Sequence, residues 1–170
     1  AAADFYSRLL DRVRAQPGIA STGATNFLPF VAAWRMRFLV NGRPRPAAGD
    51  EPIAQHQTVD EQYFQALGVP LQKGRFFEER DSLLAPGVVL VKRTLADREW
   101  HGEDPIAPTV SISARGVGPM GRVLLPAAAE YQVIGVVGDI KNNGLAGAVE
   151  PTLYFTHRPF PFKGMDIVVQ

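Results

Sequence analysis

The 170-residue chain contains no cysteine. This absence excludes disulfide scaffolds, thiolate metal sites, iron–sulfur clusters and cysteine nucleophiles, although it does not fix the cellular compartment. The chain also has little net charge, since 18 basic and 17 acidic residues leave a formal charge of +1. A nearly neutral chain has no general attraction for nucleic acid or anionic lipid, so no nucleic-acid partner is expected.

Long apolar runs are missing as well. The best candidates, VLLPAAA and YQVIGVVG, are much shorter than the roughly 18 residues that a membrane-spanning helix needs. The opening AAADFYSRLL has neither the basic nor the apolar region of a signal peptide. Hydrophobic residues make up 46% and charged residues 21%, which is typical of a globular chain. We therefore expect a soluble domain, either complete or cut from a longer protein.

The first helix is predicted from a four-residue repeat near the start of the chain. Phe5, Leu9 and Val13, with Tyr6 and Leu10 beside them, form the stripe of an amphipathic helix. Asp4 is the expected N-cap, and Pro17–Gly18 stops the helix.

Two shorter helices and many strands are predicted farther along. Asp60 is expected to cap a helix that ends at Gly68, and another helix spans residues 94–100. The run at 88–91 is continuously apolar, as in a strand buried on both faces. The other strands are predicted from alternation or β-branched residues at 19–27, 34–40, 53–59, 110–113, 131–137, 152–155 and 166–169. The predicted fold class is α+β (mixed α/β), with many short strands and short helices.

One segment formally matches the dinucleotide-binding pattern G-x-G-x-x-G. Gly116, Gly118 and Gly121 satisfy the spacing, but that site needs a helix N-terminus directly after the glycines. Here Pro119 lies inside the motif and the extended sequence RVLLP follows it. We interpret the glycines as a hairpin tip. No phosphate-binding P-loop and no G-x-S-x-G nucleophile elbow is present either.

The remaining polar candidates have ordinary structural explanations. His56, His101 and His157 lie far apart in the sequence and lack metal-ligand spacing, although a cluster in space stays open. Each is expected on the surface or in a strand. Asn142 and Asn143 are interpreted as turn-forming residues.

Two charged groups are treated in the same way. The acidic run Glu78, Glu79 and Asp81 beside Arg80 is interpreted as a solvated turn rather than an acid–base pair. The loop residues Arg43–Arg45 make a poor phosphate-binding patch in a nearly neutral chain. We therefore assign no catalytic, cofactor-binding or metal-binding residue and expect no cofactor.

Six segments, in order, resemble the MacB-like periplasmic core domain of ABC transporter permeases of the macrolide-exporter and FtsX-like class. Each segment has a structural pattern, such as a capped helix or a glycine-containing buried strand, rather than an active-site pattern. The segments are FYSRLLDRVRAQPGI (5–19), VDEQYFQALGVPLQKGRFFEERD (59–81), VVLVKRTLADREW (88–100), GEDPI (102–106), YQVIGVVGDIKNNGL (131–145) and EPTLYF (150–155).

The sequence departs from the family pattern at three places. Ala107 and Pro108 replace a glycine and a basic residue, and His101 stands where proline is usual. Lys92 replaces an asparagine that could cap the following helix. These changes affect the expected turn geometry more than the family resemblance.

The resemblance implies a fold of two parts. Residues 1–33 and 161–170 would form part of a porter-like β-α-β subdomain that stands on the membrane. Residues 34–160 would form an inserted small mixed α/β subdomain. The family's first strand, its final helix and both flanking membrane spans are not in the sequence, so we expect exposed apolar surface on the porter-like side.

The resemblance also implies a non-catalytic role. The chain would be the periplasmic (extracytoplasmic) domain of an inner-membrane permease, relaying ATP-driven conformational change to export, efflux or signalling. Implied partners are its own transmembrane helices, a cytoplasmic ATPase subunit or domain, a periplasmic adaptor with an outer-membrane channel, and a second copy in a homodimer. The alternative is a self-contained soluble ligand-binding domain or enzyme with an unrecognised pocket. No transported substrate or adaptor contact is assigned. Trp34 and the loop Arg43–Pro46 are the candidates for a protruding contact, and Trp34 fits the core equally well.

Overall fold

The computed structural model describes residues 2–28, 34–82, 87–106, 108–118, 121–124, 130–140, 148–156 and 164–170. Two α-helices longer than one turn, α1 and α3, and many short strands form within these residues, which confirms the predicted α+β class. In chain order the elements are α1 (Ala2–Arg14), β1 (Thr22–Thr25), β2 (Trp34–Val40), β3 (Ile53–Val59), α2 (Tyr63–Ala66), β4 (Leu71–Gly74), η1 (Glu79–Ser82), β5 (Gly87–Lys92), α3 (Arg93–Trp100), β6 (Thr109–Gly118), β7 (Gly121–Leu124), β8 (Glu130–Val137), β9 (Thr152–Thr156) and β10 (Asp166–Val169).

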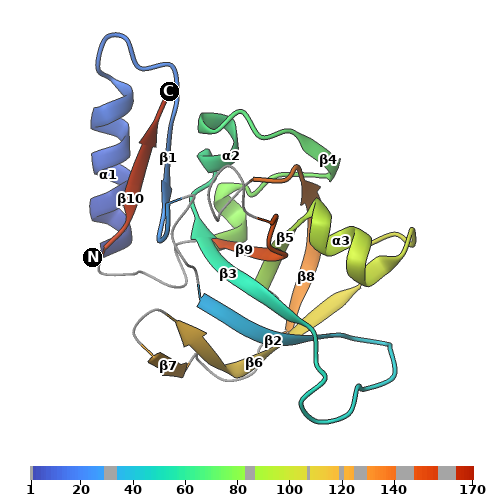
Figure 1. Cartoon of the computed structure of the whole chain (residues 1–170). Helices are drawn as coiled ribbons and strands as arrows, with labels where there is room; N and C mark the ends of the chain where they lie inside the picture. The colour runs from blue at the N-terminus through green and yellow to red at the C-terminus, as the bar shows by residue number, and fades with distance from the viewer. Residues whose placement is uncertain are drawn as a thin grey trace.

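The larger part of the molecule is a sheet that closes on itself. The strands pair in the order β3, β2, β6, β8, β5 and β9, and β9 then pairs with β3. The β3–β9 and β5–β8 pairs are parallel, and the other four are antiparallel. β4 extends the sheet beside β8, and β7 extends it beside β6. We call the six strands of the closed path, without β4 and β7, the closed sheet (Figure 1).

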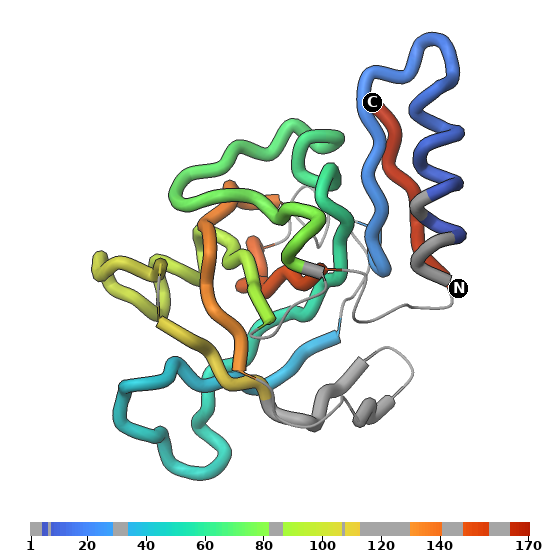
Figure 2. The backbone as a smooth tube through the Cα atoms, turned by 180° about the vertical axis from the view of Figure 1, so that it is seen from behind, coloured from blue at the N-terminus to red at the C-terminus, as the bar shows by residue number. Residues whose placement is uncertain are grey.

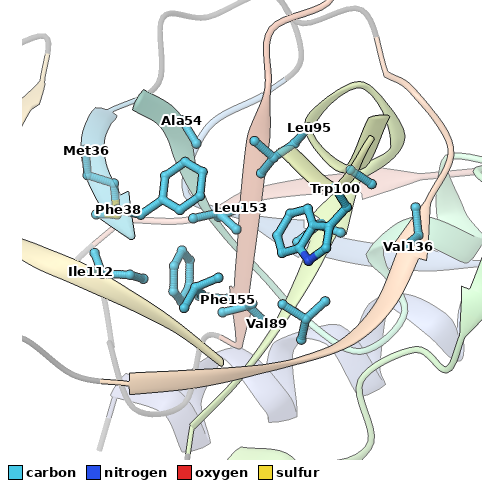
Figure 3. Packing of buried hydrophobic residues seen from close by; sticks show 14 residues of the cluster. Met36, Phe38, Ala54, Val89, Leu95, Trp100, Ile112, Val136, Leu153 and Phe155 are labelled. Atoms are coloured by element: carbon cyan, nitrogen blue, oxygen red, sulfur yellow. The ribbon is translucent and has the colours of Figure 1, made fainter. Parts of the chain in front are cut away.

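Side chains on one face of the closed sheet pack into a single apolar core. In β5, Val89 and Val91 belong to this core, whereas Leu90 belongs to a second cluster on the other face. The prediction that this strand is buried on both faces is therefore confirmed. Figure 3 shows Leu95 and Trp100 of α3 packed among the strand residues of the same core.

The second apolar cluster lies where α2 covers the opposite face. Tyr63 and Phe64 of α2 pack with Leu90 and Tyr154 from two neighbouring strands. The rings of Phe64 and Tyr154 meet edge to face, with centroids 4.9 Å apart. Apolar residues at successive positions of β5, β8 and β9 thus serve two cores in alternation, because successive side chains of a strand point to opposite faces.

A smaller part, formed by α1, β1 and β10, lies beside the closed sheet (Figures 1 and 2). We call it the helical lobe. β10 pairs antiparallel with β1 along its whole length, and α1 packs on β1. Leu10 of α1 is buried, and the Tyr6 hydroxyl accepts a hydrogen bond from the Met165 N–H. Both ends of the described chain lie in this lobe.

The sequence located the elements well and their boundaries less well. The strands predicted at 34–40, 53–59 and 166–169 are confirmed at those bounds. The strand predicted at 19–27 is shorter, and the one predicted at 110–113 continues to Gly118, because its extension gains hydrogen-bonded partners in β2 and β7. Such partners come from distant parts of the chain and leave no local signal.

The helix predicted near the start of the chain is confirmed as α1, but its predicted N-cap is wrong. Asp4 is not the N-cap, because the helix already begins at Ala2. Leu10, which lies beside the predicted stripe, is buried, whereas Phe5 from the stripe itself is 56% exposed. Apolar residues surround more of this helix than β1 covers, so the repeat alone did not select the buried side. Within the described residues, no helix is long and apolar enough to cross a membrane.

Truncating a ring in the core of the closed sheet should destabilise the protein strongly. Phe155 is 2% exposed and packs against Tyr131 and His56. We expect Phe155→Ala to lower the free energy of unfolding by about 3–5 kcal/mol, measured by urea denaturation. The matched control Phe5→Ala removes an exposed ring and should cost less than about 1 kcal/mol. Equal losses for the two variants would contradict the assigned core.

Candidate functional site

The helical lobe meets the closed sheet at a junction around the ends of β1 and β3. Thr25 of β1 lies opposite Val59 of β3, the one ladder pair between these two strands in the described residues. Helix α2 follows β3 in the chain and also packs against β1. We call this region the junction, and it comprises Arg14, Gly23–Asn26, Gln57–Asp60 and Tyr63.

Asp60 is the residue through which three segments are connected. Its side chain is 1% exposed, and its Oδ1 accepts a hydrogen bond from the Ala24 N–H of β1 at 2.9 Å. Its Oδ2 accepts from Nη2 of Arg14, on α1, at 3.2 Å. The Asp60 N–H in turn donates to the Ala24 carbonyl at 2.9 Å. The end of β3 is therefore bonded to both the strand and the helix of the lobe.

Further polar side chains continue this connection beyond Asp60. Nε2 of the buried Gln57 lies 3.0 Å from the Thr25 hydroxyl oxygen and 2.9 Å from the Tyr63 hydroxyl oxygen. The side-chain oxygen of Asn26 accepts from the Thr58 N–H at 2.8 Å, and the Asn26 N–H donates to the Thr58 carbonyl at 3.0 Å. Hydrogen bonds are directional, so this set fixes the orientation of the lobe as well as its distance from the sheet.

Gly23 allows β1 to approach α2 closely. A Cβ atom at this position would lie 2.5 Å from the Cα and 3.0 Å from the backbone nitrogen of Tyr63. Both neighbouring atoms belong to the backbone, which cannot move aside as the end of a long side chain can. A residue larger than glycine would therefore separate the lobe from α2.

The environment of Asp60 also changes its acidity. Burial raises the pKa of Asp60 to about 6, against the opposing effects of the Ala24 hydrogen bond and the Arg14 charge. The neighbouring Glu61 carboxylate raises the pKa further. Because the folded protein binds this proton more tightly than the unfolded chain does, ionisation of Asp60 weakens folding as the pH rises from about 4 to about 7.

The three histidines do not form a site in the described part of the chain. His56 is buried between the rings of Trp34 and Phe155, and burial lowers the pKa of His56 to about 3, so the imidazole is neutral at physiological pH. His101 is exposed at the end of α3, and His157 lies outside the described residues. Among the described residues, no group of three or more His, Asp or Glu side chains is placed to hold a metal ion.

The glycine motif lies in a hairpin, as we predicted. Gly116 and Gly118 belong to β6, and Gly118 pairs with Gly121 at the start of β7. A strand therefore follows the motif where a dinucleotide site would need a helix. Pro119 lies outside the described residues, as do Asn142 and Asn143.

The acidic run is only partly the solvated turn that we predicted. Asp81 has a side chain only 6% exposed, and both of its oxygens accept hydrogen bonds from Arg75, at 2.6 and 2.8 Å. Burial alone would raise the pKa of Asp81, but these bonds bring it below its ordinary value. Glu78 and Glu79 are exposed, as expected. The sequence pointed to Arg80 as the basic neighbour and missed Arg75.

Two departures from the family pattern have visible consequences. Lys92 is fully buried at the N-cap position of α3, and its side chain makes no capping hydrogen bond. The Asp139 carboxylate caps the helix instead, because it accepts hydrogen bonds from the Thr94 N–H at 2.9 Å and from the Thr94 hydroxyl at 2.7 Å. Burial lowers the pKa of Lys92 to about 8. His101 adopts a φ of 47°, which proline cannot, so the turn after α3 differs from one that contains proline. Ala107 lies outside the described residues.

Sequence reasoning missed the junction, although a signal was present. The segment AQHQT (54–58) consists mostly of polar residues, yet every one of them is buried. Asp60 was expected to cap α2, but Gln62 holds the N-cap position and the Asp60 carboxylate bonds across to β1 and α1. A polar strand with buried side chains indicates partners on both faces, and only the tertiary structure supplies them.

These observations define the class of the molecule: a mixed α+β domain whose smaller helical lobe is held to a closed sheet by a buried polar junction. Comparison with protein families then identifies the family. Residues 6–168 match the MacB-like periplasmic core domain, and the chain belongs to that family.

Solved structures share the fold. The periplasmic region of MacB from Actinobacillus actinomycetemcomitans aligns with a TM-score of 0.58 at 20% sequence identity, covering 95% of this chain. The extracellular domain of the ABC-type transporter YknZ from Gram-positive bacteria aligns with a TM-score of 0.54 at 14% identity, covering 95% of this chain and 70% of its own. This chain spans 62% of the length of the MacB periplasmic region. No curated protein sequence matches.

A methyl group at the closest contact of the junction should be costly. We expect Gly23→Ala to destabilise the protein by about 2–3 kcal/mol, because the new Cβ would overlap the backbone of Tyr63. The control Gly164→Ala places its Cβ in open space and should leave the free energy of unfolding within about 0.5 kcal/mol. Urea denaturation measures both, and a loss below that of the control would contradict the close approach.

The buried carboxyl group of Asp60 should make the free energy of unfolding depend on pH. Since the pKa of Asp60 is raised to about 6 in the folded protein, its contribution is fully present below about pH 4 and is lost as the pH rises through 6. Asp60→Asn removes this titration. The stability of the wild type relative to the variant should fall by on the order of 2 kcal/mol between pH 4 and pH 7. Denaturation curves across this range test it, and a difference that stays constant with pH would refute the assignment.

Proposed function

We propose that this chain is the periplasmic domain of an inner-membrane ABC transporter permease of the MacB/FtsX-like type. In this proposal the domain is non-catalytic and moves as one body, relaying conformational change that ATP hydrolysis generates elsewhere to export, efflux or signalling. Membership of the MacB-like periplasmic core domain family supports the location. The fold shared with the MacB periplasmic region supports the architecture.

The single observation that carries the relay proposal is the set of bonds at Asp60. A body that transmits motion must keep its parts in fixed orientation. The Asp60 carboxylate, which is buried, connects α1 through Arg14 and β1 through Ala24 to the end of β3. Displacing the helical lobe would break these bonds together and leave a buried carboxylate without its partners, which is energetically unfavourable.

The division of the chain into subdomains belongs to the same proposal. We assign residues 1–33 and 161–170 to a partial porter-like subdomain and residues 34–160 to the inserted α/β subdomain. The pairing of β10 with β1, next to the single ladder pair between β1 and β3 in the described residues, supports this division. In this proposal the porter-like part stands on the membrane.

The proposed partners follow from the family. They are the permease's own transmembrane helices, a cytoplasmic ATPase subunit or domain, a second permease copy, and a periplasmic adaptor with an outer-membrane channel. The substrate is left open. The relay needs no catalytic residue in this domain, so none is assigned.

Distance measurements within the full-length permease test the relay. Spin labels at Arg12→Cys on α1 and Arg93→Cys on α3 report on the lobe and on the helix of the closed sheet. These 170 residues contain no cysteine, and any cysteine elsewhere in the permease is first replaced by serine. Double electron–electron resonance in lipid nanodiscs, with the ATPase present, compares the states with and without a non-hydrolysable ATP analogue. We expect the distance within one domain to stay constant, while the distance between Arg93→Cys labels of two protomers changes.

The junction supplies the matched pair of variants. Asp60→Asn should broaden the distance distribution within the domain, since it removes the charge that pairs with Arg14. Asp104→Asn, which removes an ion pair with Lys73 outside the junction, should not. A nucleotide-dependent change within the domain, or no change between protomers, would show that the domain does not act as a rigid relay. Turnover of a small molecule by the purified chain would contradict the non-catalytic assignment.

A further inference from the structure

Two adjoining cavities lie along β2 and beside the loop of residues 41–52. Figure 1 shows this loop projecting from the closed sheet. One has a volume of about 240 Å³ and lies within the loop, where Pro44, Pro46 and Pro52 form its walls. The other has a volume of about 250 Å³ and extends over β2 and β6. Both are lined by Leu39 and Arg45, so they form one continuous depression, which we call the β2 groove.

Contacts with α3 hold the loop that forms the groove in place. Arg43 donates to the backbone carbonyl of Glu99 at the end of α3, and its guanidinium lies 5.9 Å from the centre of the Trp100 ring. Proline rings fix the backbone of the loop walls. A groove that is already shaped loses little conformational entropy on binding, which favours affinity.

The charges of the groove are balanced with one exception. Arg37 pairs with Glu51 at 3.0 Å, and Arg43 pairs with Glu103 at 2.6 Å. Glu99, which also lines the groove, accepts from Arg98 at 2.7 Å. Arg45 is exposed and, in the described part of the chain, makes no ion pair or side-chain hydrogen bond. One guanidinium therefore stands uncompensated where the two cavities meet.

We propose that the β2 groove binds an extended peptide segment of a partner protein, in which one Asp or Glu lies between apolar side chains. The carboxylate would pair with Arg45, and an apolar side chain on either side would enter each cavity. Arginine suits this role because its planar guanidinium can bind a carboxylate with two hydrogen bonds. The two cavities meet at Leu39 and Arg45, so an extended segment can place one side chain in each cavity while its acidic residue lies at Arg45. This proposal does not depend on the relay function.

Selection from a peptide library tests the proposal. The 170-residue chain is immobilised and probed with a random dodecapeptide library displayed on phage. We expect the enriched peptides to share a single acidic residue flanked by apolar residues. Arg45→Glu should weaken their binding at least about tenfold, since a charged hydrogen-bonded pair contributes roughly 1.5–3 kcal/mol. Arg12→Glu makes the same charge change on exposed α1 and should leave the affinity unchanged.

A charge exchange makes the test specific. A selected peptide whose acidic residue is replaced by lysine should bind the Arg45→Glu variant better than the wild type. Arg45→Gln, with circular dichroism and a denaturation midpoint equal to those of the wild type, separates loss of binding from loss of fold. The proposal is overturned if no peptide is enriched, if the enriched peptides lack an acidic residue, or if Arg12→Glu weakens binding as much as Arg45→Glu. Binding of octanoate with the affinity of the peptides would also overturn it, because the site would then select small anions.

Discussion

The bonds of one buried carboxylate organise the molecule. Asp60 lies at the end of β3, and its two oxygens hold β1 through Ala24 and α1 through Arg14. These segments are separated by 36 to 46 positions in the sequence, so local contacts cannot bring them together. The carboxylate is buried and would be costly without these donors, because water does not replace them. The same constraint that holds the helical lobe in place therefore penalises any movement that would release it.

The closed sheet gives this attachment a rigid base. Its interior is filled by side chains from all of its strands and from α3, and close packing resists deformation. Closure also leaves β3 and β9 without a free edge, since each pairs with a neighbour on both sides. The closed sheet is thus a densely packed body, and the junction fixes the helical lobe to it.

The family relationship shows how a fold persists when its sequence changes. Identity to the solved periplasmic and extracellular domains is 20% and 14%, yet 95% of the chain follows the same fold. The start of α3 illustrates the tolerance. Lys92 cannot cap this helix as an asparagine could, and Asp139, from a segment after β8, caps it instead. The physical requirement is a hydrogen-bond acceptor at the first turn, and any part of the chain that reaches the site can provide it.

The sequence by itself determined the elements and the fold class, because alternation and apolar runs report directly on buried faces. It thus located β2, β3 and β10 at their observed bounds and identified β5 as buried on both sides. The tertiary structure alone decided which polar groups meet. Gln57 and Asp60 become a junction only when β1 and α1 fold against them, and Glu103 pairs with Arg43, 60 positions away, only in the folded chain. A hydrogen bond or ion pair depends on distance in space, and the order of residues along a chain does not contain that distance.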